Sequence, residues 1–532
     1  MPSVSAHVAA ALAHHVDQVF GVMGNGNAHF LDALERDGAV AYTAMRHEAG
    51  AVVAADAYHR ASGRLAAATA TYGAGFTNTL TALAEARQAH IPLVLVVGDE
   101  PTSGPRPWGV DQIALASAVG ARTYTVGRTD AAATTVIAVE HALTYRVPTV
   151  LAIPYDVATR EAGPVPQAPS PATRAPLAPA GPFAAGAIAD AAAALAGAER
   201  PFLLAGRGAW ISGAGAALGD LAAATGALTA GTALGRGVFP DARYDLGVTG
   251  GFGAERAMEA VRTADVAVLF GASLNQFTMR FGDLFAPGTR VVQVDVAPAA
   301  THPHVGAYVR GDARLVAEAL VQELRALGAT PSGWRESVDL ADLVVRPAGD
   351  GLAADGRLDP RSAAARIGEL LPADRVVVSD GGHFIGWANM YWPVASPDRM
   401  IMVGTAYQSI GLGFPSVAGA ALAHPESTVV LTTGDGGGLM ALADLESAVR
   451  VAGGRGLTVV WNDAAYGAEV NLYGLKGLAQ GPMRIPEVDF AALGAAVGAQ
   501  GVVVRTLADL AALAEWAARP ADERPFLLLD LR

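Results

Sequence analysis

The chain has 532 residues, of which 52% are apolar and 16% are charged, enough for three to four domains that each bury a core. The formal net charge is -13 and Lys476 is the single lysine, so no basic tract could neutralise a nucleic-acid backbone. The sequence has no cysteine, which excludes disulfides, thiolate metal sites and a cysteine nucleophile. Any metal must therefore bind oxygen or histidine.

The segment 1–20 predicts a soluble amphipathic helix, because it lacks the basic start and long apolar core of a signal peptide. No apolar run reaches the roughly 18 to 20 residues that span a bilayer. We therefore expect a cytoplasmic protein whose partners include neither membrane nor nucleic acid.

Apolar runs typical of strands alternate with Ala-rich helical stretches along most of the chain. This alternation predicts an α/β protein with three doubly wound parallel-sheet domains. A Pro-rich segment and a second irregular stretch interrupt the pattern and read as linkers. The predicted parts are a first domain (1–162), a Pro-rich linker (163–182), a middle domain (183–330), a second linker (331–357) and a third domain (358–532).

The segments 65–100 and 428–463 share one layout: a strand, a glycine loop, a helix and a second strand. Any two βαβ units look alike at this level of detail. The sequence therefore leaves open whether the outer domains arose by duplication.

A glycine-rich run, GDGGG, follows the strand-like run STVVLTT, and a helix is expected from about Leu439. The next strand-like run ends at Asn462 and Asp463. Because consecutive strands of a right-handed βαβ unit are commonly neighbours, Asp435 should emerge beside one of these residues at the carboxyl edge of the sheet. A strand spacing of about 4.8 Å lets both side chains reach one hard cation, Mg2+ or Ca2+. Since glycines also let backbone N–H groups approach an anion, the pattern favours a metal–diphosphate site over a plain turn.

Glu48 lies where the strand-like run AVAYTAM leads into the apolar helix AGAVVAADAY. A carboxylate at a helix start can simply interact with the helix dipole, which is worth about 0.3–1 kcal/mol. A carboxyl buried among Ala and Val could instead share a proton with a ligand nitrogen near neutral pH. The residues alone leave both interpretations open.

Together these motifs resemble those of the thiamin diphosphate (ThDP) enzymes of the acetolactate synthase and 2-oxoacid decarboxylase superfamily, over the whole chain. The resemblance implies a pyrimidine-binding first domain, a middle domain and a diphosphate-binding third domain. The family metal motif reads GDG followed, after a spacer, by Asn-Asn, and its third protein ligand is a backbone carbonyl. Here the resemblance implies Asp435, Asp463 in the place of the second asparagine, and the Ala465 carbonyl, with Asn462 as the alternative to Asp463 because a second acid adds negative charge beside a diphosphate.

The resemblance extends to the cofactor residues. Glu48 in MRHEAGA resembles the cofactor-activating glutamate, and TYGAGFTN resembles the TxGxGxTN loop near the pyrimidine ring. Ile410 in QSIGLG matches the bulky residue that supports the bent form of ThDP, although it could equally be an ordinary core residue. His383 could bind the cofactor, although it could equally be a surface histidine. The implied cofactor-binding residues are Thr71, Gly73, Asn78, His383, Ser409, Ile410, Gly434, Gly436, Gly437, Gly438, Tyr466 and Gly467.

The implied mechanism begins with Glu48, which bonds the pyrimidine N1′ and promotes formation of the C2 ylide. The ylide adds to a 2-oxoacid, CO2 leaves, and the resulting enamine is protonated or attacks a second carbonyl. Asn25, Gln112 and Glu469 match positions near the substrate in relatives, although Asn25 and Glu469 also read as ordinary loop and surface residues.

The resemblance also implies partners and cofactors: ThDP with Mg2+, and a homodimer or homotetramer whose active sites join the first domain of one subunit to the third of another. FAD in the middle domain is unlikely, because glycine turns such as that around Gly206 persist in relatives without it. Two other functions stay open: a nucleotide-dependent oxidoreductase, which lacks a strict G-x-G-x-x-G here, and a non-catalytic subunit of the same fold. Retention of Glu48, Asp435 and Asp463 argues against the second.

Overall fold

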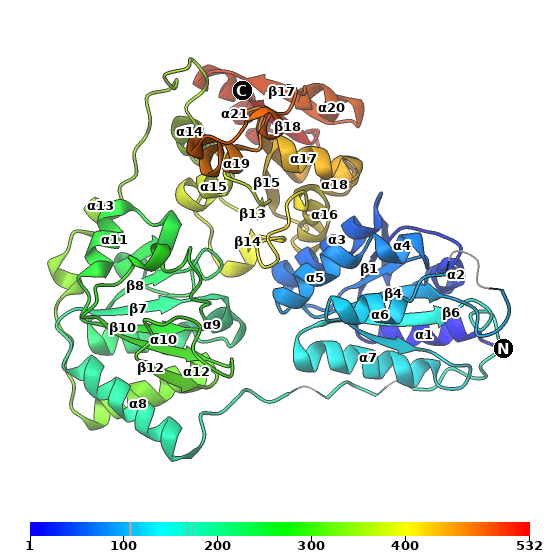
Figure 1. Ribbon diagram of the computed structural model, residues 1–532, viewed down its shortest axis with the longest axis horizontal. Coiled ribbons are helices and arrows are strands. Elements are labelled where there is room, and N and C mark those ends of the chain that lie inside the picture. Colours follow the sequence, from blue (N-terminus) through cyan, green and yellow to red (C-terminus); the bar gives the residue numbers. More distant parts are fainter. Residues whose placement is uncertain (106–108, 168, 173) are drawn as a thin grey trace.

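The computed structural model describes residues 1–105, 109–167, 169–172 and 174–532. It contains three six-stranded sheets whose strand pairs are all parallel, with helices on both faces (Figure 1). This confirms the predicted α/β class with three doubly wound domains. The strands of each sheet fall inside one predicted domain range, while the domain boundaries themselves stay predictions.

The first domain, blue to cyan in Figure 1, has the strand order β2-β1-β3-β4-β6-β5. Its central strands are Ala- and Val-rich and buried on both faces, as expected for a covered parallel sheet. The strands are β1 (Gln18–Gly21), β2 (Ala41–Ala44), β3 (Ala67–Ala70), β4 (Leu93–Asp99), β5 (Arg122–Thr125) and β6 (Pro148–Pro154). The helices are α1 (Val4–Ala13), α2 (Ala28–Asp37), α3 (Glu48–Ser62), α4 (Ala74–Thr77), α5 (Leu80–Gln88), α6 (Gln112–Ala118) and α7 (Ala131–Tyr145).

The middle domain, green in Figure 1, has the order β12-β11-β10-β7-β8-β9, the usual order of dinucleotide-binding sheets. Its strands are β7 (Pro201–Ala205), β8 (Leu228–Gly231), β9 (Asp245–Val248), β10 (Val266–Phe270), β11 (Arg290–Asp295) and β12 (Ala307–Arg310). Its helices are α8 (Gly181–Ala196), α9 (Arg207–Ile211), α10 (Gly215–Thr225), α11 (Glu255–Arg262) and α12 (Ala313–Ala326).

The third domain, yellow to red in Figure 1, has the order β14-β13-β15-β16-β18-β17, which matches that of the first domain strand for strand. The two similar segments of sequence therefore occupy equivalent places, β3 to β4 and β15 to β16. The strands are β13 (Arg375–Ser379), β14 (Met400–Ile401), β15 (Thr428–Gly434), β16 (Gly456–Trp461), β17 (Gln500–Val504) and β18 (Leu527–Leu531). The helices are α14 (Pro360–Leu370), α15 (Ile385–Tyr391), α16 (Gly413–Ala423), α17 (Asp435–Met440), α18 (Leu445–Ala452), α19 (Gly467–Leu472), α20 (Phe490–Ala496) and α21 (Ala511–Ala517).

Both predicted linkers are largely irregular. The part of 163–180 that the structure describes, without positions 168 and 173, has no helix or strand. The helix α8 begins at Gly181, near the predicted end of this linker. Pro182 lies in the first turn of α8, where a missing N–H costs nothing. The second linker contains a short helix, α13 (Leu340–Leu343).

The largest core cluster joins the first and third domains. The helices α3 and α16 pack so closely that a Cβ on Gly419 would lie 2.1 Å from the Ala54 carbonyl oxygen. Only glycine permits this approach of two backbones. The outer domains of one chain are therefore held together by an apolar helix pair. Among the described helices, none has the length and apolarity needed to cross a membrane.

The glycine turn after β7 packs against the turn after β10. A Cβ on Gly206 would lie 2.3 Å from the Gly271 carbonyl oxygen, and one on Gly208 would lie 2.8 Å from the Gly271 Cα. Close packing of these two turns thus accounts for the glycines without a dinucleotide.

His59 on α3 makes the free energy of unfolding depend on pH. Burial is the main cause that lowers the pKa of His59 to about 3, while its Nδ1 lies 2.9 Å from the Arg64 carbonyl oxygen. Between about pH 6.5 and 3 the unfolded chain binds a proton that the folded chain does not, so stability falls as the pH falls, by up to ~1.4 kcal/mol per unit. We expect His59→Gln to lose less stability than wild type between pH 7.5 and 5, measured by urea unfolding. Parallel losses in the two proteins would contradict the assignment.

Candidate active site

The predicted metal residues follow two neighbouring strands. Gly434, the last residue of β15, is in register with Trp461, the last residue of β16. Asp435 and Asn462 therefore emerge side by side at the carboxyl edge of the third sheet. The predicted adjacency of the two strand ends is confirmed.

The expected start of the helix near Leu439 is wrong, because α17 begins at Asp435 directly after β15. The glycines lie inside this helix instead of forming a loop before it. Each packs so closely against a side chain that an added Cβ would lie less than 3.0 Å from it. Gly436 faces the Tyr466 ring, Gly437 the Asp380 carboxylate and Gly438 the Phe490 ring. Gly434 is similarly close to the Phe384 ring. The glycine run is thus explained by close side-chain packing around a short helix.

Asp435 is buried and accepts hydrogen bonds from the backbone N–H groups of Gly436 and Ala464. Burial, followed by the negative charge of Asp463, raises the pKa of Asp435 to about 6. Two carboxylates thus share this corner of the site, and their negative charges repel each other. A divalent cation would stabilise them together.

Asn462 and Asp463 each present an oxygen without a hydrogen-bond partner. The Asn462 Nδ2 donates to Asp530 Oδ1 and to the Val488 carbonyl, both at 2.8 Å, which leaves its Oδ1 buried and unpartnered. Asp463 Oδ1 is likewise buried and unpartnered, while its Oδ2 lies 3.2 Å from His383 Nε2. Buried oxygens without donors are costly, and a hard cation satisfies them. The donor set therefore fits Mg2+.

No group of three or more His, Cys, Asp or Glu side chains with metal-binding geometry occurs in the described part of the chain. A metal here would depend on amide and carbonyl oxygens as well as on the two carboxylates. Ala465 is buried and follows Ala464, whose φ of 55° lies in the left-handed region. Such a turn redirects the backbone directly after Asp463.

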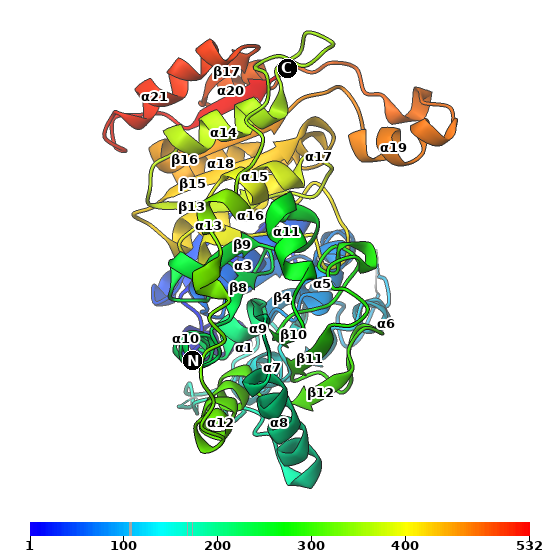
Figure 2. The same ribbon diagram turned by 90° about the vertical axis from the view of Figure 1, so that its left-hand side faces the viewer.

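The next residues form a close-packed corner with His383. The imidazole of His383 lies so near Gly467 that a Cβ there would be 2.3 Å from His383 Cε1. Tyr466 packs over Gly436, and Glu469 lies exposed on α19, which projects from the third domain in Figure 2. The structure thus brings His383, Tyr466 and Gly467 close to Asp435 and Asp463, and Glu469 lies on the outer side of these residues.

A fully buried carboxylate that the sequence analysis missed holds the predicted support for the cofactor. Asp380 Oδ1 accepts from the N–H groups of Gly381, Gly411 and Leu412 at 2.8–3.2 Å, and its Oδ2 accepts from Thr433 Oγ1. Burial raises the pKa of Asp380. Ser409 and Ile410 lie just before these donors and are half-buried, so Ile410 is not an ordinary core residue. The only signal in the sequence was an acid directly after the strand-like run RVVVS.

The first-domain residues gather around the start of α3. Glu48 is half-buried, because it occupies the first turn of α3 and the core begins further along this helix. Its Oε2 accepts from Asn78 Nδ2 at 3.0 Å. Gly75 lies close enough that a Cβ would be 3.3 Å from Glu48 Oε1. The predicted glutamate and the TYGAGFTN loop are therefore in direct contact.

The loop itself is held by the side chains of Thr71 and Gln112. Thr71 Oγ1 accepts from the Gly26 N–H at 2.9 Å. Gly73, with φ of 65°, donates its N–H to Gln112 Oε1 at 2.9 Å, and Gln112 Nε2 donates to the Gly98 carbonyl and Asp99. Gln112 also lines a cavity of about 550 Å³ at the carboxyl ends of β4, β5 and β6. Its amide thus braces the loop at the wall of this cavity.

Asn25 lies exposed beside the same loop, where its Nδ2 donates to the Tyr72 hydroxyl at 3.2 Å. The neighbouring Asn27, which the sequence analysis did not select, is buried and holds the turn through the Gly24 N–H, the Val22 carbonyl and Thr69. The pair therefore divides into one structural asparagine and one that is available to a ligand.

Comparison with known proteins identifies this arrangement. Three family models match in order: the thiamine pyrophosphate enzyme N-terminal TPP binding domain (2–119), the central domain (188–320) and the C-terminal TPP binding domain (380–529). The chain belongs to the thiamin diphosphate-dependent enzymes. The first matched domain contains Glu48 with the loop 71–78, which we call the Glu48 group. The third contains Asp435, Asn462 and Asp463, which we call the Asp435 group.

Individual proteins are similar to this chain over most of its length. The chain is 27% identical to an acetolactate synthase of Mycobacterium avium over 539 residues, covering 96% of this chain and 84% of the relative. It is 27% identical to the acetolactate synthase isozyme 3 large subunit of Escherichia coli over 450 residues, covering 82% and 78%. The structure matches the ThDP-dependent 4-hydroxybenzoylformate decarboxylase of Rhodococcus jostii RHA1 with a TM-score of 0.78, 22% identity and coverage of 100% and 99%, which supports the fold. The chain is thus a ThDP-dependent enzyme that is similar in sequence to acetolactate synthases and in fold to a ThDP-dependent decarboxylase.

Proposed function

We propose that the protein uses ThDP and Mg2+ to act on a 2-oxoacid, removing CO2, joining the remaining fragment to a second carbonyl compound, or both. The supporting observation is the pair of buried, unpartnered oxygens on Asn462 and Asp463 beside the Asp435 carboxylate. They lie in the domain that matches the C-terminal TPP binding model. When bound, ThDP supplies a carbon nucleophile and an acceptor for the electrons that loss of CO2 releases.

The third domain would hold the metal and the diphosphate. Asp435, either Asp463 or Asn462, and the Ala465 carbonyl would bind Mg2+, which in turn keeps diphosphate oxygens in its shell. His383, Ser409 and the N–H groups of the α17 region would contact the diphosphate end, and Ile410 would support the central part of the cofactor. These residues bind and orient, and they move no proton in the proposed reaction.

The first domain would activate the cofactor. Glu48 would share a proton with the pyrimidine N1′, and Asn78 orients the carboxylate through its bond to Oε2. Thr71 and Gly73 shape the loop around the pyrimidine. We assign Asn25, Gln112 and Glu469 to the substrate side, where the amide N–H groups of Asn25 and Gln112 would donate to a substrate oxygen and the Glu469 carboxylate would accept from a substrate donor.

We further propose a homodimer or homotetramer in which the Glu48 group of one subunit faces the Asp435 group of another. No hydrogen bond or ion pair joins these two groups within the described residues of one chain. Light scattering coupled to size-exclusion chromatography tests the assembly. A monomer that turns over substrate would contradict the shared site.

The reaction is tested by incubating the protein with ThDP, Mg2+ and a panel of 2-oxoacids, with and without aldehyde acceptors, and identifying products by mass. We expect CO2 with an aldehyde or a 2-hydroxyketone. Failure of ThDP to bind in the presence of Mg2+ would overturn the proposal.

A further inference from the structure

The segment 402–412, between β14 and α16, carries Ser409 and Ile410 and has an unusual backbone. Gly404, Gln408 and Gly411 all have positive φ, at 104°, 58° and 79°. For Gln408 this conformation carries a strain of order 1 kcal/mol or more, so the surrounding structure must impose it. A segment that changes direction at three places needs anchors outside itself.

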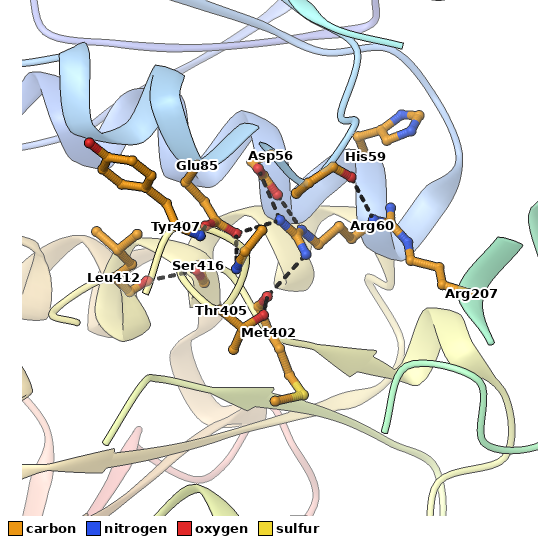
Figure 3. A network of polar contacts seen from close by, with 12 residues as sticks. Asp56, His59, Arg60, Glu85, Arg207, Met402, Thr405, Tyr407, Leu412 and Ser416 are labelled. Atoms are coloured by element: carbon orange, nitrogen blue, oxygen red, sulfur yellow. Dashed lines mark hydrogen bonds and ion pairs between the residues drawn. The ribbon is translucent and has the colours of Figure 1, made fainter. Parts of the chain in front are cut away.

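One anchor comes from the first domain. Glu85 on α5 accepts from the Tyr407 N–H at 2.6 Å and from the Ala406 N–H at 3.4 Å. Arg60 on α3 donates to the Met402 carbonyl at 3.0 Å and to Glu85 at 3.1 Å, as Figure 3 shows. Since Asp380 holds the other end of the segment, the cofactor support lies between two buried carboxylates, one from each outer domain.

The first-domain anchor is a buried set of charges. The side chains of Arg60, Asp56 and Glu85 are 3%, 1% and 0% exposed. Arg207 reaches the set from the middle domain and donates to the Ala89 carbonyl at 3.5 Å (Figure 3). Arg60 pairs with both Asp56 and Glu85 away from water, so neither carboxylate can move without leaving a buried charge less compensated. Arg60 thereby holds the Glu85 carboxylate in place, near the point where Arg207 of the middle domain contacts the first domain.

A reciprocal anchor holds the segment that presents Glu48. Asp444, at the end of the 3-10 helix Leu442–Asp444 in the third domain, accepts from the Arg46 N–H at 2.9 Å. It also fills the space over Gly50, because a Cβ there would lie within 2.0 Å of Asp444 Oδ2. Arg450 on α18 donates to the Ala44 carbonyl at 2.6 Å.

The two anchors are related by the matching topology of the outer domains. Glu85 lies between β3 and β4 and binds the segment after β14, whereas Asp444 lies between β15 and β16 and binds the segment after β2. In their sheets β2 and β14 are equivalent, and so are the two strand pairs. The helices that follow the anchored segments, α3 and α16, cross at Ala54 and Gly419. An approximate two-fold axis that superimposes the two outer domains on each other would therefore also exchange the Glu85 and Asp444 contacts.

We propose that Glu85 and Asp444 are positioning residues, through which each outer domain sets the cofactor segment of the other outer domain in the same chain. Glu85 fixes the Ile410 support, and Asp444 fixes the start of α3 and with it Glu48. The inference rests on the proposed function, in which Ile410 and Glu48 act on ThDP.

Glu85 is tested with Glu85→Gln against the matched control Asp56→Asn. Both substitutions remove one negative charge from the same buried set, but Asp56 does not contact segment 402–412. Glutamine has one acceptor oxygen, so it cannot accept from both Tyr407 and Arg60 as the two oxygens of Glu85 do. In the presence of Mg2+, we expect Glu85→Gln to weaken ThDP binding about tenfold and inorganic diphosphate binding by less than about twofold, because a displaced Ile410 affects only the larger ligand. Asp56→Asn should weaken ThDP binding by less than about threefold. Titration calorimetry measures all of these affinities.

Equal loss of ThDP affinity in the two variants would overturn the role of Glu85, as would parallel loss of ThDP and diphosphate. Should Glu85→Gln fail to fold, Glu85→Asp keeps the charge, withdraws the carboxylate from Tyr407 and should show the same selective loss. Wild-type protein that binds no ThDP would instead refute the proposed function.

Asp444 is tested with Asp444→Ala against Ser447→Ala, since the Ser447 hydroxyl donates to the same carboxylate without touching the first-domain segment. We expect Asp444→Ala to retain ThDP but to slow deuterium exchange at its C2 carbon about tenfold, measured by NMR, and Ser447→Ala to change it less than about twofold. Asp444→Asn, which keeps an acceptor for Arg46, should restore most of the rate. Unchanged exchange in Asp444→Ala would overturn the role of Asp444.

Discussion

Glu48→Gln should bind ThDP with nearly wild-type affinity and lose turnover by about 10²- to 10⁴-fold, the usual range for a positioned acid–base group. The substitution preserves the size of the side chain and its acceptor for Asn78, so the loop 71–78 should stay in place. What it removes is the carboxyl that would share a proton with the pyrimidine nitrogen. Steady-state kinetics on the 2-oxoacid that the product screen identifies, together with ThDP titration, measures both effects.

Glu446→Gln is the control for that variant. Glu446 pairs with Arg46, two residues from Glu48, and with Arg450, in partly exposed ion pairs at the same domain junction. Exposed pairs contribute about 0–1 kcal/mol, so turnover should stay within a few-fold of wild type. Equal activity of Glu48→Gln and wild type would exclude the proposed activation step, whereas a similar loss in both variants would assign the effect to the junction.

Asp435→Ala should abolish Mg2+ binding and with it weaken ThDP binding by at least about 100-fold. The substitution removes the buried carboxylate whose pKa is raised by burial and by Asp463, and it leaves the unpartnered oxygens of Asn462 and Asp463 without the charge that would attract a cation. Titration of Mg2+ and ThDP measures the loss. Treatment of the wild type with EDTA should reproduce it.

Asp463→Asn is the matched variant, because it keeps the oxygen and removes only the second negative charge. We expect it to bind Mg2+ as well as wild type or better, since the charge of Asp463 is one of the causes that raise the pKa of Asp435. Loss of metal in Asp463→Asn but not in Asp435→Ala would reverse the assignment. Loss of Mg2+ binding in Asn462→Ala, with binding kept in Asp463→Asn, would make Asn462 the second side-chain ligand.

Much of the third-domain site could be predicted because its parts are close in sequence and on consecutive strands. Register between β15 and β16 follows from the short βαβ connection, so Asp435 and Asn462 had to emerge together. The start of α17 could not be predicted in the same way. Three glycines read as a loop, yet helix α17 continues through them because ring and carboxylate side chains from elsewhere pack against them.

The environment of Glu48 shows the same limit. The Ala- and Val-rich sequence after it predicts burial of the helix, and α3 is indeed buried from its second turn. A residue in the first turn, however, projects toward the sheet edge, where its partner is Asn78, 30 residues away. Local pattern therefore identified the helix but not the contact.

By itself the sequence determined the three parallel sheets, the adjacent strand ends at Asp435 and Asn462 and the family, because strand alternation and motif spacing are local properties of the chain. Only the tertiary structure decided what holds the cofactor segments in place: Asp380 under Gly411, Glu85 on Tyr407 and Asp444 on Arg46. Glu85 and Tyr407 are separated by 322 residues and Asp444 and Arg46 by 398, so these contacts exist only once α3 has packed on α16. A buried carboxylate gives no sign in the sequence of which backbone N–H it will meet, since that depends on the docking of whole domains.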